Sequence, residues 1–166
     1  AAALKITDII IPCVDQSSLG NAKAVDRLVK QMTKVIPIIE KENINLSLET
    51  DLAPKPFSEL LNKLNSKNIT VNYDIGNSAA LGFDPIEELI AYGDRISDIH
   101  IKDRVINGGP VTLGEGNADF AKFFSKLLEF GYKGPFIMQA YRDDEGVEIF
   151  KKQLSWIKPY LGAFYD

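Results

Sequence analysis

Features that would place a chain in several common functional classes are scarce or missing in this sequence. The 166 residues include a single cysteine, Cys13, so no disulfide can form within the chain. No apolar run reaches the roughly 20 residues that a membrane-spanning helix needs. The first residues also lack the charged region and cleavage pattern of a secretory signal. We therefore expect a cytoplasmic protein.

Positive charge is also in short supply. Lysine and arginine together number 19 against 23 acidic residues, which gives a net charge of −4. No basic block and no stripe of interleaved basic and aromatic residues occurs in the sequence. Because nucleic acids and anionic membranes attract basic surfaces, this composition predicts neither of them as a partner.

What the sequence does contain is a regular alternation of short β-branched runs and amphipathic segments, with enough apolar residues (45%) for one ordinary domain. Strands are predicted at 6–13, 44–49, 69–75, 96–101 and 135–141, and helices at 22–41, 56–66, 85–92, 118–130 and 146–160. Asp84 and Asn117 are predicted to cap the third and fourth of these helices. Repeated βα units indicate parallel strands joined by right-handed crossovers, whose carboxyl ends share one face.

Four residues able to bind a divalent metal stand at the ends of four successive predicted strands. They are Glu49, Asp74, His100 and Gln139. Each is separated from the next by about the length of one strand, one helix and their loops. Repetition of the βα unit should therefore bring all four side chains to one rim of the sheet.

Side-chain parity indicates which face of the sheet these residues occupy, because successive strand residues point to opposite faces. The residues that share the predicted inner face are Asn45, Ser47 and Glu49; Asn72 and Asp74; and Asp98, His100 and Lys102. An ordinary doubly wound sheet buries both faces and reads as continuous apolar runs. A polar inner face at the carboxyl end instead suits a barrel with a site in its mouth.

The motifs at these positions resemble a known family. Asp74-Ile-Gly-Asn77 closes one strand, His100-Ile-Lys-Asp-Arg104 closes the next, a loop reads LGEGNADF from Leu113, and the last strand ends in Gln139. Together they resemble the xylose isomerase-like TIM-barrel superfamily and, more narrowly, the sugar phosphate isomerase/epimerase family. The resemblance covers essentially the whole chain and matches the C-terminal portion of that family.

This resemblance implies an α/β fold of the (βα)8 TIM-barrel family, in which a complete barrel has about 250 residues. The chain supplies about five parallel βα units, so we expect residues 1–166 to form a single incomplete or truncated barrel domain without the N-terminal strands. An opened barrel exposes two sheet edges. We therefore predict either a homo-oligomer or a missing N-terminal segment.

The resemblance also implies a metal site and a chemistry. Glu49, Asp74, His100 and Gln139 would hold Mn²⁺, Mg²⁺, Co²⁺ or Zn²⁺, since three oxygen ligands and one imidazole suit these ions. Glu49 would be the catalytic base that removes the proton next to a sugar carbonyl, giving an enediolate intermediate. Many epimerases of this superfamily have glutamate where this chain has Gln139. An amide can bind a metal but cannot accept a proton, which slightly favours isomerisation over epimerisation.

Substrate-binding residues are also expected by this resemblance. Lys102, Arg104 and Arg142 are candidates for anionic groups, and the backbone N–H groups of Gly114 and Gly116 are candidates for a phosphate. Salt bridges with nearby aspartates are the alternative role for Lys102 and Arg142.

Two readings besides a sugar or sugar phosphate isomerase/epimerase stay open. One is a lyase similar to keto-inositol (inosose) dehydratases, which would use the same metal and the same base. The other is a non-catalytic sugar-binding remnant, because three βα units and the last carboxylate are absent.

Overall fold

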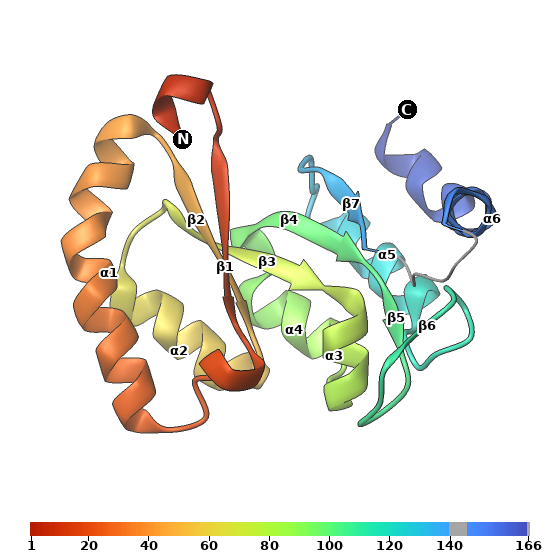
Figure 1. Cartoon of the computed structure of the whole chain (residues 1–166), viewed down its shortest axis with the longest axis horizontal. Helices are drawn as coiled ribbons and strands as arrows, with labels where there is room; N and C mark the ends of the chain where they lie inside the picture. The colour runs from red at the N-terminus through yellow and green to blue at the C-terminus, as the bar shows by residue number, and fades with distance from the viewer. Residues whose placement is uncertain (140–145, 166) are drawn as a thin grey trace.

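The computed structural model describes residues 1–139 and 146–165, and its centre is an open, five-stranded parallel sheet (Figure 1). The strands stand in the order β1-β2-β3-β4-β7, so each is added beside the one before it. They are β1 (Asp8–Cys13), β2 (Asn45–Thr50), β3 (Ile69–Asp74), β4 (Ile96–Ile101) and β7 (Phe136–Met138). This is the βα architecture of a TIM barrel that does not close, as the sequence predicts.

Helices lie between these strands and after the last of them, and several begin at a side-chain cap. The α-helices are α1 (Ala22–Glu42), α2 (Pro54–Leu64), α3 (Ile75–Leu81), α4 (Pro85–Tyr92), α5 (Phe120–Glu129) and α6 (Val147–Leu161). Short 3₁₀ helices are η1 (Ala2–Leu4), η2 (Asp15–Ser17), η3 (Gly93–Arg95) and η4 (Gly162–Phe164). Asn21 accepts a hydrogen bond from the Ala24 N–H at the start of α1, and Asp84 accepts one from the Ile86 N–H at the start of α4. The predicted cap at Asp84 is confirmed.

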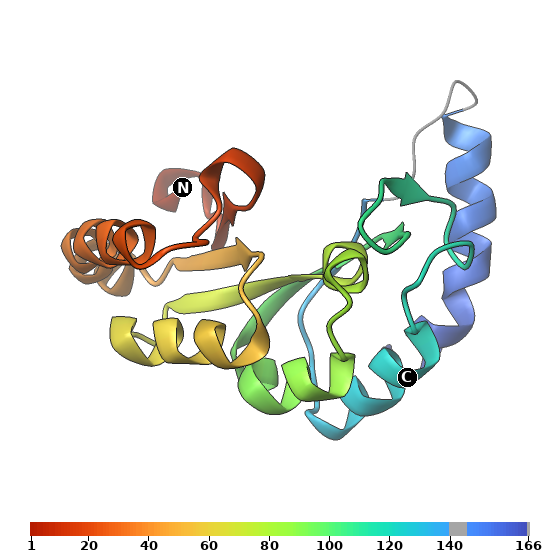
Figure 2. The ribbon, with the colours of Figure 1, turned by 90° about the horizontal axis from the view of Figure 1, so that it is seen from below.

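The helices α2, α4 and α5 follow one another along one side of the sheet (Figure 2). The strand side chains with outward parity form the core against them, and Leu48, Ile99 and Ile101 have no exposed surface. Burial of these apolar side chains is the main force that holds the helices on the sheet. The opposite face carries the polar residues, which confirms the predicted parity.

Three local features differ from the sequence prediction. Helix α3 was not predicted; it starts directly after β3, with Asp74 as its cap. Strands β5 (Asp103–Arg104) and β6 (Pro110–Val111) form a small antiparallel hairpin. The predicted cap at Asn117 is wrong, because α5 begins at Phe120 and Asp119 accepts the hydrogen bond from the Lys122 N–H.

The two ends of the sheet remain as open edges within the described residues. Strand β1 pairs with β2 alone, and β7 pairs with β4 alone. Self-association and a preceding segment both stay predictions. Among the described helices, none combines the length and the apolar character that crossing a bilayer requires.

Candidate metal and substrate site

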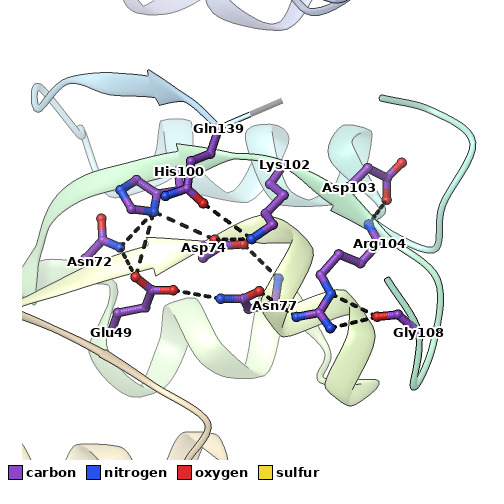
Figure 3. Close-up of polar contacts among 10 residues, drawn as sticks. All are labelled: Glu49, Asn72, Asp74, Asn77, His100, Lys102, Asp103, Arg104, Gly108 and Gln139. Atoms are coloured by element: carbon purple, nitrogen blue, oxygen red, sulfur yellow. Dashed lines mark hydrogen bonds and ion pairs between the residues drawn. The ribbon is translucent and has the colours of Figure 1, made fainter. Parts of the chain in front are cut away.

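Three neighbouring strands bring Glu49, Asp74 and His100 together at their carboxyl ends (Figure 3). The histidine Nδ1 lies 3.9 Å from Glu49 Oε2 and 3.7 Å from Asp74 Oδ2. The three candidate ligand atoms all lie within 4.8 Å of one another. The register of the parallel strands explains this convergence, because Asp74 stands directly opposite His100.

Burial makes this cluster costly without a cation. Asp74 is 5% exposed, and its Oδ2 accepts no hydrogen bond from the residues that the structure describes. Burial raises the pKa of the Glu49 carboxyl, and the neighbouring Asp74 carboxylate raises it further, while His100 and Lys102 oppose the shift. Two buried carboxylates and an imidazole with one orphaned oxygen fit a divalent metal of intermediate hardness.

Gln139, the fourth predicted ligand, is exposed at the end of β7. Its Oε1 accepts a hydrogen bond of 3.3 Å from Lys102 Nζ, and the same ammonium lies 3.6 Å from Asp74 Oδ2. Lys102 therefore links Gln139 to Asp74 (Figure 3). The placement is compatible with the predicted ligand role of Gln139, which stays a prediction.

Two asparagines of the site have roles that the sequence analysis missed. Asn72 Nδ2 lies 3.3 Å from Glu49 Oε2 and 3.2 Å from His100 Nδ1. Asn77 Nδ2 donates to Glu49 Oε1 at 2.7 Å. Inward parity did indicate Asn72, but no pattern in the sequence reveals that α3 turns Asn77 back toward Glu49.

A cleft of about 430 Å³ opens beside the candidate metal cluster of Glu49, Asp74 and His100. Its lining combines acidic and basic side chains: Asp15, Glu49, Asp51, Asn77, Lys102 and Arg104 all contribute. The Arg104 guanidinium donates to Asn77 Oδ1 at 2.8 Å and to the Gly108 carbonyl at 2.7 and 3.0 Å. Arg104 and Lys102 thus border the same cleft, as predicted substrate-binding residues would.

The glycine-rich loop has a different role from the one predicted. The N–H groups of Gly114 and Gly116 each donate to the Asp103 carboxylate at 2.9 Å. Asp103 has no exposed surface, and it also accepts from the N–H groups of Arg104 and Ala118. Because these N–H groups point inward to a buried side chain, they are not available to a phosphate. Arg142, the remaining predicted anion-binding residue, lies outside the described residues.

Comparison with known proteins identifies the family. A family model described as xylose isomerase-like TIM barrel matches residues 1–160. The chain belongs to the xylose isomerase-like TIM barrel family. The resemblance to xylose isomerase-like TIM barrels that the sequence motifs indicate is confirmed.

Individual relatives of this TIM-barrel chain share about a third of their residues with it over part of its length. It is 34% identical over 89 residues to an inosose dehydratase of Geobacillus kaustophilus. This match covers 43% of this chain and 29% of the dehydratase. It is 31% identical over 116 residues to a putative L-ribulose-5-phosphate 3-epimerase, SgbU, of Haemophilus influenzae. This match covers 59% of this chain and 39% of the epimerase. The chain thus spans well under half the length of these curated relatives.

A solved structure supports the fold independently of close sequence similarity. The IOLI protein, whose structure has a bound zinc atom, superposes with a TM-score of 0.78 at 18% identity. The match covers 99% of this chain and 66% of that one. At this identity the likeness shows the fold alone.

Proposed function

We propose that this chain carries the metal site and base of a divalent-metal-dependent isomerase or epimerase acting on a sugar or a sugar phosphate. The observation that carries the proposal is the convergence of Glu49, Asp74 and His100 on one buried point, with Asp74 Oδ2 lacking a hydrogen-bond donor among the described residues. The similarity to a putative sugar phosphate epimerase supports the substrate class. Gln139 would complete the ligand set, with Mn²⁺, Mg²⁺, Co²⁺ or Zn²⁺ as the ion.

When bound, the metal would polarise the substrate carbonyl and stabilise the negative charge that develops as the neighbouring proton leaves. The residues of the chain would do the remaining work. Glu49 is the proposed base, because it is a carboxylate that both belongs to the candidate metal cluster and lines the cleft. Lys102 and Arg104, at the border of the cleft, would hold hydroxyl or anionic groups of the substrate.

Whether the reaction is an epimerisation or an isomerisation depends on how many proton-transfer groups face the substrate. Epimerisation with delivery to the opposite face calls for a second acid or base, and the amide of Gln139 cannot provide one. A single carboxylate can carry a proton between adjacent carbons on one face, which is what aldose-ketose isomerisation needs. Isomerisation is therefore the preferred form of the proposal.

Dehydration of a keto-inositol is the second candidate, and the inosose dehydratase relative is the observation that favours it. Glu49 would remove the same kind of proton, and the hydroxyl group on the neighbouring carbon would then leave as water by taking that proton back from the Glu49 carboxyl. One C–H bond and one C–O bond are thereby replaced by a C=C bond. The two candidates differ in their products, since dehydration removes one water and isomerisation preserves the formula.

The test is solvent-deuterium incorporation over a panel of ketoses, their phosphates and inososes, with Mn²⁺ added to chelator-treated protein. We expect metal-dependent incorporation next to the carbonyl, and Glu49→Gln should lower its rate about 10²–10⁴-fold, because positioned acid-base groups contribute that much. Glu59→Gln, on the exposed face of α2, is the matched control. Mass spectrometry of the product separates isomer from dehydrated compound. Deuterium incorporation at an unchanged rate in Glu49→Gln would refute the proposed base. Absence of deuterium incorporation by the wild-type protein would favour a sugar-binding remnant.

A further inference from the structure

Asn77 contacts both carboxylates of the candidate metal site at once. Its side-chain Nδ2 donates to Glu49 Oε1 at 2.7 Å, and its backbone N–H donates to Asp74 Oδ1 at 2.8 Å. Each carboxylate therefore has one oxygen engaged by the same residue. Hydrogen bonds to an ionised acceptor are among the stronger ones in proteins, so they can fix the rotation of both carboxylate groups.

The two oxygens that Asn77 leaves free are the ones that face His100. Glu49 Oε2 and Asp74 Oδ2 lie 3.9 and 3.7 Å from His100 Nδ1. Each of these oxygens has one further neighbour: Glu49 Oε2 lies 3.3 Å from Asn72 Nδ2, and Asp74 Oδ2 lies 3.6 Å from the Lys102 ammonium. The geometry thus presents one oxygen from each carboxylate to the point where the three ligand atoms converge.

The orientation of the Asn77 amide follows from a third contact. Arg104 Nη1 donates to Asn77 Oδ1 at 2.8 Å. A guanidinium has donors only, so the oxygen of the amide must face Arg104 and the nitrogen must face Glu49. Arg104 is in turn held by the Gly108 carbonyl, which keeps this arrangement fixed at the cleft border (Figure 3).

The backbone that carries Asn77 is also held against the strand of the histidine. At Gly76, a Cβ atom would lie 2.9 Å from Lys102 Cγ and 3.0 Å from the Lys102 carbonyl carbon. This close approach seats the first turn of α3 on the residues just after β4. The position of Asn77 relative to His100 is therefore set by packing as well as by the Asp74 cap.

We propose that Asn77 is a positioning residue: its side-chain amide determines which single oxygen of Glu49 is offered to a divalent cation, while its backbone N–H holds the other carboxylate, Asp74. The inference rests on the proposed function only in requiring that a cation binds at this cluster. Without the amide, Glu49 would be free to rotate and to engage the ion through either or both oxygens. Outer contacts of this kind typically change metal affinity 10–100-fold when they are removed.

The first experiment measures Mn²⁺ affinity of the chelator-treated protein by electron paramagnetic resonance, which requires no substrate. Asn77→Ala should weaken Mn²⁺ binding about 10–100-fold. It should also change the visible absorption spectrum of the Co²⁺-loaded protein, because a rotated Glu49 alters the ligand geometry. Asn62→Ala, an identical truncation on the exposed face of α2, should match wild type in both measurements.

Two further variants separate positioning from a general loss of structure. Asn77→Leu keeps the branching at Cγ and the number of heavy side-chain atoms, and leucine suits a helix. A folded Asn77→Leu protein should therefore show the same loss of affinity even where Asn77→Ala does not fold. In a Glu49→Ala background, adding Asn77→Ala should have a much smaller effect on Mn²⁺ affinity, since its partner is already gone. An effect of equal size in that background would overturn the proposed route through Glu49.

The remaining outcomes distinguish this inference from the proposed function. If wild type binds Mn²⁺ and Glu49→Ala weakens binding while Asn77→Ala and Asn77→Leu do not, the inference fails and the metal site stands. If wild type binds no Mn²⁺, the metal site and the positioning role both fail.

Discussion

Two buried acidic sites lie on opposite faces of strand β3, and they differ in how their oxygens are satisfied. On the inner face, Asp74 Oδ2 has no hydrogen-bond donor among the described residues. On the outer face, Glu88 of α4 is 3% exposed and accepts hydrogen bonds from Tyr73, Ser78 and Tyr92. Both carboxyls are buried, yet both Glu88 oxygens accept hydrogen bonds, whereas Asp74 Oδ2 accepts none and has the Lys102 ammonium 3.6 Å away.

This difference indicates separate roles for the two sites. The Glu88 oxygens are all engaged by hydroxyl groups, so the cluster ties α4 to β3 and to α3. Glu49 and Asp74, in contrast, keep one oxygen each directed at His100. Since an unsatisfied buried carboxylate is destabilising on its own, the inner cluster is the one that a ligand should complete.

The largest stability change should follow the loss of the outer carboxylate. Glu88→Ala leaves three buried hydroxyl groups without their acceptor and creates a cavity, so the free energy of unfolding should fall by about 3 kcal/mol. Urea denaturation measures it, with the exposed neighbouring substitution Glu87→Ala as control. A loss no greater than that of the control would mean that the outer cluster does not hold the fold together.

Asp74→Asn should behave in the opposite way in metal-free protein. It removes a buried charge beside Glu49, so the free energy of unfolding should stay within about 1 kcal/mol of wild type or rise. Addition of Mn²⁺ at 100 times its Kd should stabilise wild type by about 2.7 kcal/mol and stabilise Asp74→Asn far less. Destabilisation of metal-free Asp74→Asn to the extent of Glu88→Ala would erase the distinction between the two sites.

The smallest effect is a pH dependence from the outer cluster. Burial raises the pKa of the Glu88 carboxyl above its ordinary 4.5, against the opposing hydrogen bonds from Ser78, Tyr73 and Tyr92. The folded protein therefore binds this proton more tightly than the unfolded chain does. The resulting stabilisation is complete below pH 4.5 and is lost as the pH rises through the folded-state pKa.

Glu88→Gln should remove this contribution. Urea denaturation at a series of pH values should show wild type losing stability relative to Glu88→Gln as the pH increases. Glu49 shifts in the same direction, and it is present in both proteins, so the difference between them isolates Glu88. A difference that is constant with pH would show that Glu88 has the same pKa in the folded and unfolded chain.

The strands and the inward parity were predictable from sequence, because a two-residue period and the βα alternation are local signals. Asp74 and His100 therefore had to share a face once the strands were placed side by side. Helix α3 was not predictable in the same way. Its seven residues are few, and Gly76 near its start is a poor helix former, so the segment reads as a turn.

The glycine-rich loop is a second feature whose role could not be predicted from the sequence. Its sequence suggests N–H groups open to a phosphate, and a local motif contains no information about a carboxylate more than ten residues earlier. In the folded chain Asp103 accepts from Gly114 and Gly116, and a Cβ atom at Gly116 would lie 2.1 Å from Asp103 Oδ1. Glycine is needed there for close approach to the aspartate.

The sequence by itself determined the βα repeat, the polar inner face and the identity of Glu49, Asp74 and His100 as neighbours, because these depend on periodicity and on strand order. Only the tertiary structure decided which oxygen of each carboxylate faces the histidine, that Asn77 and Arg104 hold that orientation, and that the loop glycines serve Asp103. Those outcomes depend on distances between side chains far apart in the sequence, which are fixed only when the helices pack on the sheet.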